Sequence, residues 1–322
     1  MTQDTTLSPQ TRALPTAEQP VAEGPATAMP ETGASALPGN RPLAASLWML
    51  GAIGGFSSMA VAGRLAAPYH DTFEIMTWRS AVGVVIILGV LLLRPDQRRV
   101  GLGQLHLHFL RNIAHFTGQN LWFFALTLIP LSQLFALEFS YPLIVALAAP
   151  LVLGERLTRN RLLAALLGFV GVLIVAQPWS SGGLSTGTLA ALLAAFGFAG
   201  SALTTKVITR RVPMIEILFW LVIMQLAFGL IMAGRDGDIA LPTAQSVLPL
   251  TIIGCAGLGA HFCLTRALSL APATVVVPMD FLRLPLIAVI GMLLYGEPLL
   301  WSVFVGGAII LLANLLNLRK ES

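Results

Sequence analysis

Two carboxylates stand inside stretches that are otherwise almost entirely apolar. Glu138 lies in the run LEFSYPLIVALAAPLVLGE, and Asp280 lies in the run MDFLRLPLIAVIGMLLYGE. An ionised side chain at the centre of a bilayer costs about 2.5–3.5 kcal/mol, so it needs a partner or a hydrated cavity. Burial disfavours the charged form of a carboxyl group, which would let the two carboxylates carry protons. They could instead bind a cationic or zwitterionic group. The structural alternative is that Glu138 is held neutral by neighbours such as Ser140 or Gln133.

Two arginines are placed to accompany these carboxylates. Arg79 lies at a depth similar to that of Glu138 in its own apolar stretch, which permits an ion pair between helices. Arg283 follows Asp280 by three residues, a spacing that puts both on one face of a helix, where they can pair. The alternatives are a purely structural ion pair, or an Arg79 side chain that reaches the lipid headgroups.

Histidines and a tyrosine extend the same set. His115 and His261 fall within apolar stretches, although such histidines are more often hydrogen-bonded core residues than ligands. His106 and His108 are expected beside Arg111 at the inner interface, facing headgroups or water. We therefore expect one substrate or ion site, lined by Arg79, His115, Glu138, Tyr141, His261, Asp280 and Arg283.

Four further glutamates are interpreted as structural. Glu74 and Glu216 begin apolar stretches, and negative charge at a helix N-terminus is favoured by the helix dipole. Glu155 and Glu297 each follow a glycine that can end a helix, with a gating role as the alternative.

The composition fixes the class of protein. Hydrophobic residues make up 56% of the 322-residue chain and charged residues 11%, against about 25% charged in a soluble protein. Long apolar stretches recur from residue 43 to the C-terminus, and about 20 apolar residues cross a bilayer core as a helix. The sequence predicts an all-α polytopic membrane protein in contact with the lipid bilayer, with no nucleic-acid partner. It contains no catalytic triad, no phosphate-binding glycine loop and no metal cluster, so no enzyme activity, metal or cofactor is predicted.

Ten transmembrane helices are expected. They are 43–64, 73–93, 107–128, 131–153, 162–176, 188–207, 215–233, 248–268, 274–295 and 301–318. Residues 1–40, rich in Pro, Thr, Ala and Gly, are expected to form a disordered cytoplasmic tail. Cytoplasmic loops collect Lys and Arg, and an N-terminus inside places ten basic residues on the inner side: Arg94, Arg98, Arg99, Arg156, Arg159, Arg161, Arg210, Arg211, Arg319 and Lys320. Both termini are therefore predicted to be cytoplasmic, in a chain that spans the cell inner (plasma) membrane.

The chain also contains an internal repeat with an offset of 142 residues. The offset relates residues that composition alone would not align: Phe56 with Phe198, Arg64 with Lys206, Glu74 with Glu216, Trp78 with Trp220, Glu138 with Asp280 and Glu155 with Glu297. The repeats, 43–176 and 188–318, hold five spans each, so the second enters the membrane with the opposite orientation. Two inverted five-helix repeats are typical of secondary transporters with a site near the midplane.

These motifs resemble a known family. The carrying features are FEIMTWRS at 73–80, the ALTLIP and ALSLAP elements before the fourth and ninth spans, the Pro142–Leu157 ending and YGEP at 295–298. The pattern resembles the drug/metabolite transporter superfamily, specifically its ten-helix EamA-type members. The second copy departs from it, since Leu221 stands where Arg79 would repeat, which favours a special role for Arg79.

The resemblance implies a secondary transporter of a small molecule such as an amino acid, vitamin, cofactor-like metabolite or drug. Charges of both signs in the predicted cavity favour a zwitterionic or amphipathic solute, moved by alternating access and coupled to protons if the carboxylates titrate. A membrane-embedded lipid-modifying enzyme and a non-transporting scaffold are the alternatives, and a homodimer through outer helices is compatible with the sequence.

Overall fold

The computed structural model describes Met1 and residues 41–94, 100–153, 157–179, 183–209, 211–271, 276 and 279–318. The predicted tail beyond Met1 lies outside the described residues. So do several residues named above: Arg98, Arg99, Glu155, Arg156, Arg210, Arg319 and Lys320.

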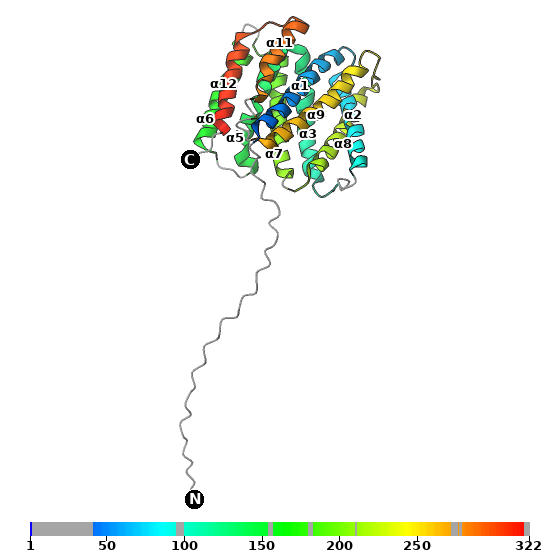
Figure 1. Ribbon diagram of the computed structural model, residues 1–322, viewed down its shortest axis with the longest axis vertical. Coiled ribbons are helices and arrows are strands. Elements are labelled where there is room, and N and C mark those ends of the chain that lie inside the picture. Colours follow the sequence, from blue (N-terminus) through cyan, green and yellow to red (C-terminus); the bar gives the residue numbers. More distant parts are fainter. Residues whose placement is uncertain are drawn as a thin grey trace. The chain divides into compact units, whose positions relative to one another are not determined.

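The described residues form helices and contain no strand (Figure 1). The first half contains α1 (Pro42–Ala66), α2 (Thr72–Leu93), α3 (Leu105–Leu128), α4 (Leu131–Glu138), α5 (Tyr141–Leu153) and α6 (Arg159–Ala176). The second half contains α7 (Thr186–Ile208), α8 (Met214–Ala233), the short 3₁₀ helix η2 (Gly234–Asp236), α9 (Val247–Leu270), α11 (Arg283–Tyr295) and α12 (Trp301–Leu318).

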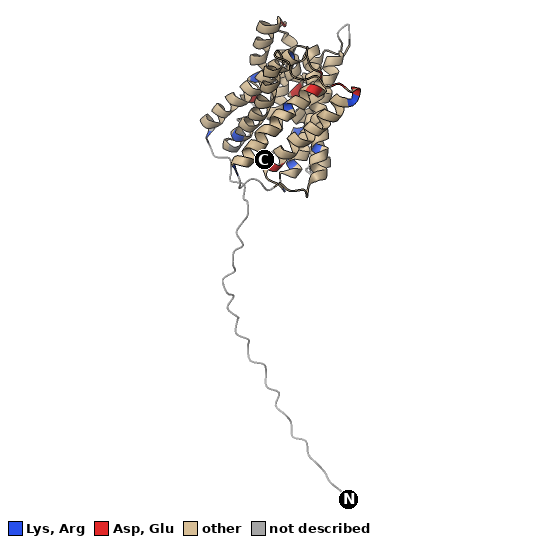
Figure 2. Cartoon of the chain, turned by 90° about the vertical axis from the view of Figure 1, so that its right-hand side faces the viewer, with Lys and Arg blue, Asp and Glu red and all other residues tan. Residues whose placement is uncertain are grey.

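Eight segments of the described chain are long and apolar enough to cross a membrane, with α4 and α5 counted as one span. The 24-residue α3 is long enough but more polar, and the 13-residue α11 is shorter. Together these are the ten predicted spans, and the all-α prediction is confirmed. Charged residues are scattered thinly along the helices, as Figure 2 shows.

The fourth span is broken in its middle. It runs over Leu131–Val152, but α4 ends at Glu138 and α5 begins at Tyr141. Pro142 explains the position, because it has no N–H with which to bond the carbonyl of Glu138 one turn earlier. The ninth span starts its regular helix, α11, close to Pro285, which lies in the first turn, where a missing N–H costs little.

Helices related by the 142-residue offset occupy equivalent positions. α1 packs against α9, and its twin α7 packs against α3, the twin of α9. α2 packs against its own twin α8, and α6 packs against its own twin α12. The last two pairs lie at opposite edges of the bundle in Figure 1. These pairs are what a two-fold relation between two inverted five-helix repeats produces.

Twin glycines let the equivalent helix pairs approach closely. A Cβ atom at Gly55 of α1 would lie 2.8 Å from the Cβ of Ala260 and 3.0 Å from the carbonyl oxygen of Ala256, both on α9. At its twin, Gly197 of α7, a Cβ would lie 2.7 Å from the Cα of Gly118 on α3. Small residues therefore set the distance between these helices, as in many membrane bundles.

Replacing Gly55 with leucine is expected to lower the free energy of unfolding by about 1–3 kcal/mol, because the side chain would force α1 and α9 apart. The neighbouring Gly54 is the matched control, since a Cβ there meets no atom within 4 Å. The measurement is chemical unfolding in detergent micelles. Equal losses for Gly55→Leu and Gly54→Leu would contradict the close crossing.

The start of α2 is bonded to the loop between α8 and α9. The indole Nε1 of Trp78 donates to the carbonyl oxygen of Ala240 at 3.0 Å, and the amide of Ala240 donates to Glu74 Oε1 at 2.6 Å. Glu74 also forms a capping box with Asp71 at the N-terminus of α2. Its structural interpretation is therefore confirmed.

The start of α8 is bonded in the same way to the loop between α2 and α3. Trp220 Nε1 donates to the carbonyl oxygen of Gly101 at 3.1 Å, and the amide of Gly101 donates to Glu216 Oε2 at 3.0 Å. His108 lies 3.5 Å from Glu216 and is fully buried. The expectation that His108 faces headgroups or water is thus wrong, because α8 and this loop cover the start of α3. Each half supplies the loop that completes a helix end of the other half.

Candidate functional site

A cavity of about 440 Å³ lies between the two repeats. Its wall is formed by α1, α3, the break between α4 and α5, α7, α8, α9 and the residues just before and at the start of α11. It extends to Thr209 and Met214, at the turn between α7 and α8, on the predicted cytoplasmic side. Cavities of this size commonly hold small organic ligands.

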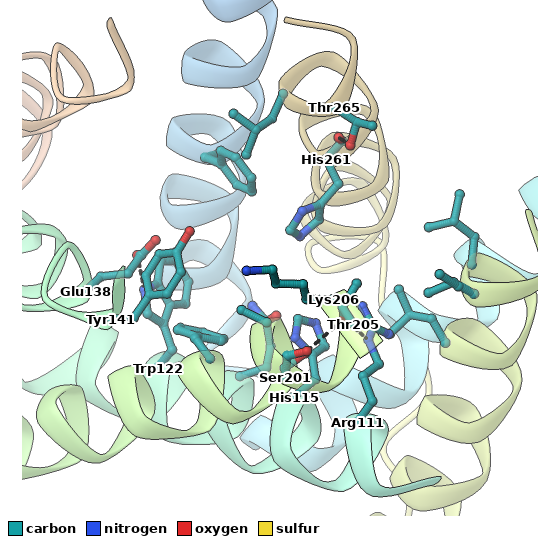
Figure 3. Close-up of a pocket in the computed structure, with 18 of the residues that line it drawn as sticks. Arg111, His115, Trp122, Glu138, Tyr141, Ser201, Thr205, Lys206, His261 and Thr265 are labelled. Atoms are coloured by element: carbon teal, nitrogen blue, oxygen red, sulfur yellow. Dashed lines mark hydrogen bonds between the residues drawn. The ribbon is translucent and has the colours of Figure 1, made fainter. Parts of the chain in front are cut away.

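Six of the seven predicted site residues line this cavity: His115, Glu138, Tyr141, His261, Asp280 and Arg283. Arg79 does not line it. It borders a smaller cavity of about 30 Å³, which shares His261, Leu218 and Leu221 with the larger one. Figure 3 shows Glu138, Tyr141 and Trp122 together at one side of the cavity, away from Arg111 and His115.

The two twin carboxylates meet on one guanidinium group. Arg283 Nη2 lies 3.5 Å from Glu138 Oε1 and 3.2 Å from Asp280 Oδ2. Trp122 Nε1 donates to the other oxygen of Glu138 at 2.7 Å. The predicted pair of Asp280 and Arg283 is confirmed, whereas Glu138 pairs with Arg283 and not with Arg79.

The proposed neutral partners of Glu138 are also engaged elsewhere. Ser140 Oγ donates to the carbonyl oxygen of Leu137, and Gln133 Nε2 bonds to Val175 and Thr188. The pairing with Arg283 arises because the break after Glu138 brings α4 against the start of α11, helices that pack together. The ion pair with Arg283 and the hydrogen bond from Trp122 hold Glu138, and neither Ser140 nor Gln133 does.

Aromatic rings enclose the Arg283 guanidinium. Its Cζ lies 4.7 Å from the ring centre of Phe56, 5.0 Å from that of Phe135 and 4.9 Å from that of Phe139. A cation over an aromatic face is stabilised by about 0.5–2 kcal/mol. Arg283 is therefore fixed by two carboxylates and three rings, and it holds both carboxylates at the cavity wall.

The other side of the cavity is basic. The rings of His115 and His261 have centres 6.4 Å apart. Arg111 Nε donates to Thr205 Oγ1 at 3.2 Å, and its Nη1 donates to Asn112 Oδ1 at 3.2 Å. Arg111 is 9% exposed. The expectation that Arg111 lies at the inner interface, beside headgroups or water, is wrong, because α7 covers this face of α3.

Several lining residues were not predicted as part of the site: Arg111, Gln119, Thr205, Lys206 and Thr265. A signal existed for Arg111, which precedes His115 by four residues and therefore shares its helix face. Among the described residues, no group of three or more His, Cys, Asp or Glu side chains could hold a metal ion.

At the end opposite the α7–α8 turn, side-chain bonds join the ends of α1, α3 and α11. Arg64, near the end of α1, forms an ion pair with Glu297. Its Nε donates to the carbonyl oxygen of Leu126 at 2.7 Å, and its Nη2 donates to that of Ile129 at 2.6 Å. One side chain thus bonds α1 to the turn after α3 and to the segment after α11.

Two neighbours complete this contact. Glu297 Oε2 accepts a hydrogen bond from the amide of Leu131, at the start of α4, at 2.8 Å. The Arg64 guanidinium lies 4.9 Å from the ring centre of Tyr295. We call Arg64, Tyr295 and Glu297 the outer closure, since they lie at the predicted outer ends of α1 and α11.

Comparison with known proteins agrees with this architecture. The model of the EamA-like transporter family matches residues 43–177 and again residues 185–319. The chain belongs to the EamA-like transporter family. It is therefore a multi-pass membrane protein of the drug/metabolite transporter superfamily, and the resemblance noted from its motifs is confirmed.

Two similar proteins have names that state a transported solute. The chain is 31% identical over 256 residues to a protein of Brucella anthropi named riboflavin transporter, covering 77% of this chain and 88% of that protein. It is 24% identical over 274 residues to a Rickettsia felis protein named S-adenosylmethionine uptake transporter, covering 85% and 92%. A crystal structure with a TM-score of 0.59 and 19% identity covers 84% of this chain and 94% of that chain, and supports the fold.

Proposed function

We propose that this EamA-like protein is a secondary transporter that carries a vitamin- or cofactor-type metabolite by alternating access, with riboflavin as the first candidate. The observation that supports it best is the cavity of about 440 Å³ between the repeats, which combines aromatic rings, paired carboxylates and hydrogen-bond donors. The relatives named above act on solutes of this size.

The wall suits a flat, amphipathic molecule. Phe56, Trp122 and Tyr141 line the cavity and offer aromatic surface for a planar ring. Glu138 can accept hydrogen bonds from ring N–H groups, while Gln119 and Thr205 suit a hydroxylated chain. This chemistry fits an isoalloxazine ring with its ribityl chain.

The difference between the two ends of the cavity supports alternating access. The cavity extends to the α7–α8 turn, and the outer closure bonds the helices at the far end. We infer a state that faces the cytoplasm, in a chain of the inner (plasma) membrane with both termini inside. Opening the outer closure would expose the same cavity to the other side, as rocking of inverted repeats does in other transporters.

Proton coupling is proposed through Glu138 and Asp280. Protonation of either carboxylate would weaken its pairing with Arg283, so proton binding and the position of α11 would be linked. Direct coupling to ATP is not proposed, because the sequence carries no nucleotide-binding loop.

The test is uptake by the purified full-length protein in proteoliposomes, with radiolabelled riboflavin and S-adenosylmethionine assayed separately. Uptake above that of empty liposomes, stimulated by an imposed proton gradient, is expected for the wild type. Glu138→Gln and Asp280→Asn should lose the response to the gradient, whereas Asp238→Asn, in an exposed loop, should keep it. Wild-type uptake no higher than that of empty liposomes with both solutes would end the proposal on substrate class.

A further inference from the structure

We propose that Arg79 and Arg111, together with His115 and His261, form a binding site for a single anionic group, a carboxylate or a phosphate. We call these four residues the basic cluster. The inference deepens the proposed function and rests on it, because the anionic group belongs either to the transported solute or to a free inorganic anion that accompanies it.

The two arginines are buried without a described carboxylate partner. Arg79 and Arg111 are each 9% exposed. Arg79 Nη1 contacts the thioether of Met76 at 3.8 Å, and Arg111 bonds to the neutral oxygens of Thr205 and Asn112. A buried cation without a counter-charge is strongly destabilising, so such a pair calls for an anion.

The described carboxylates that lie within the bundle are occupied elsewhere. Glu138 and Asp280 pair with Arg283, and Glu297 pairs with Arg64. Glu74 and Glu216 bond to the two loops that cover α2 and α8. Within the described ranges, neither arginine of the basic cluster makes an ion pair.

Arg283 shows what the same fold does with an arginine that has a structural role. Its guanidinium contacts two carboxylates and lies over three aromatic rings. Arg79 and Arg111 have no such surroundings. Their repeat twins are Leu221 and Ile253, so the two-fold architecture does not require a cation at either place.

The histidines add unused hydrogen-bonding capacity. His115 is 6% exposed, and its Nε2 atom is buried with no hydrogen-bond partner among the described residues. His261 borders both cavities, and the smaller one, of about 30 Å³, also reaches Arg79. The rings of His115 and His261 have centres 6.4 Å apart, and Arg111 lines the larger cavity with both, so the four groups surround one region.

This donor set suits an oxyanion. A guanidinium group offers a planar fork of N–H donors that matches carboxylate and phosphate oxygens. Figure 3 shows Arg111 and His115 at the side of the cavity away from Glu138 and Tyr141. A solute could therefore place an anionic group in the basic cluster and its ring near Trp122.

The experiment measures anion binding to the purified full-length protein in micelles, by calorimetry and by the midpoint of thermal unfolding. Inorganic phosphate and acetate are each added to the protein in a buffer whose background anion is a bulky organic sulfonate. The total ionic strength is kept constant. Saturable binding and a raised midpoint are expected for the wild type. Arg79→Gln and Arg111→Gln should each weaken phosphate binding at least tenfold, and the exposed Arg159→Gln should not.

A second measurement guards against misfolded variants. Because the arginines lack a described carboxylate partner, Arg79→Gln and Arg111→Gln should unfold no earlier than the wild type in the sulfonate buffer. Arg111→Lys should keep partial phosphate binding. The proposal is overturned if phosphate and acetate do not bind the wild type, or if the double variant Arg79→Gln, Arg111→Gln binds them equally well.

Riboflavin and riboflavin 5′-phosphate, which differ by one phosphate, separate the two sources of the anion. If the solute supplies it, riboflavin 5′-phosphate binds at least tenfold more tightly than riboflavin, competes with inorganic phosphate, and loses its advantage in Arg111→Gln. If a free ion supplies it, riboflavin and phosphate bind together. Arginine-dependent phosphate binding without uptake of riboflavin or S-adenosylmethionine would overturn the proposed substrate class while the anion site stands.

Discussion

Replacing Arg283 with methionine is expected to lower the free energy of unfolding by about 3–5 kcal/mol and to abolish uptake. The residue is 3% exposed and pairs with both Glu138 and Asp280. Removing one partner of a buried ion pair leaves the other partners buried and unpaired, and this accounts for the magnitude. Chemical unfolding in micelles and uptake into proteoliposomes measure the two effects.

A compensating variant separates stability from transport. Arg283→Met combined with Glu138→Gln and Asp280→Asn removes all three charges, so stability is expected to recover to within about 1–2 kcal/mol of the wild type while uptake stays absent. Arg159→Met, at the exposed start of α6, is the control and should change stability by less than about 0.5 kcal/mol. A stable Arg283→Met protein would show that the three charges are not coupled.

Removing the outer closure is expected to shift the protein towards a state open to the outside. Arg64→Ala loses the ion pair to Glu297 and two backbone acceptors, and hydrogen bonds to charged groups contribute about 1.5–3 kcal/mol each. If these bonds exist only in the state in which the outer closure is formed, their loss should raise the population of the state open to the outside roughly tenfold or more.

The shift can be followed by the reactivity of a cysteine in the cavity. Gln119→Cys is introduced together with Cys255→Ser and Cys263→Ser, and a membrane-impermeant maleimide is added to intact cells. Labelling should become about tenfold faster with Arg64→Ala and with Glu297→Gln. Arg235→Ala, at the same end of the molecule, should leave the rate unchanged. Unchanged labelling in both closure variants would show that another contact holds this end shut.

The architecture was largely predictable because it depends on one-dimensional patterns. Apolar length fixes the number of spans, and the 142-residue offset aligns residues such as Trp78 and Trp220 that apolar composition cannot match by accident. The break in the fourth span also has a local cause, since Pro142 removes one backbone donor.

Six of the seven predicted site residues line the cavity for a similar reason. A charged or polar side chain within an apolar span must avoid lipid, so Glu138, Asp280 and Arg283 had to face the interior. The partner of Glu138 was not predictable in this way. Counting from helix ends gives the depth of a residue but not which helix lies beside it, so Arg79 and Arg283 could not be told apart as partners.

The start of α3 shows the other limit. His108 and Arg111 lie close to a helix end, which in sequence indicates the membrane interface. In the structure the loop between α2 and α3 folds over α8, and α7 packs along α3, so both residues are buried. Burial by a distant helix leaves no local mark in the sequence beyond the spacing of Arg111 and His115.

The reciprocal bonds between loops and helix ends have a consequence for biogenesis. Glu74 and Trp78 are already in the membrane while the ribosome is still synthesising the second half. At that stage Ala240, whose carbonyl oxygen accepts from Trp78 and whose amide donates to Glu74, has not yet been synthesised. Until then, these groups of the first half remain solvated. Gly101 likewise lacks its hydrogen bonds until Glu216 and Trp220 have been synthesised. Maturation is thus a joint event in which insertion of α8 and the loop after it bonds the two halves together.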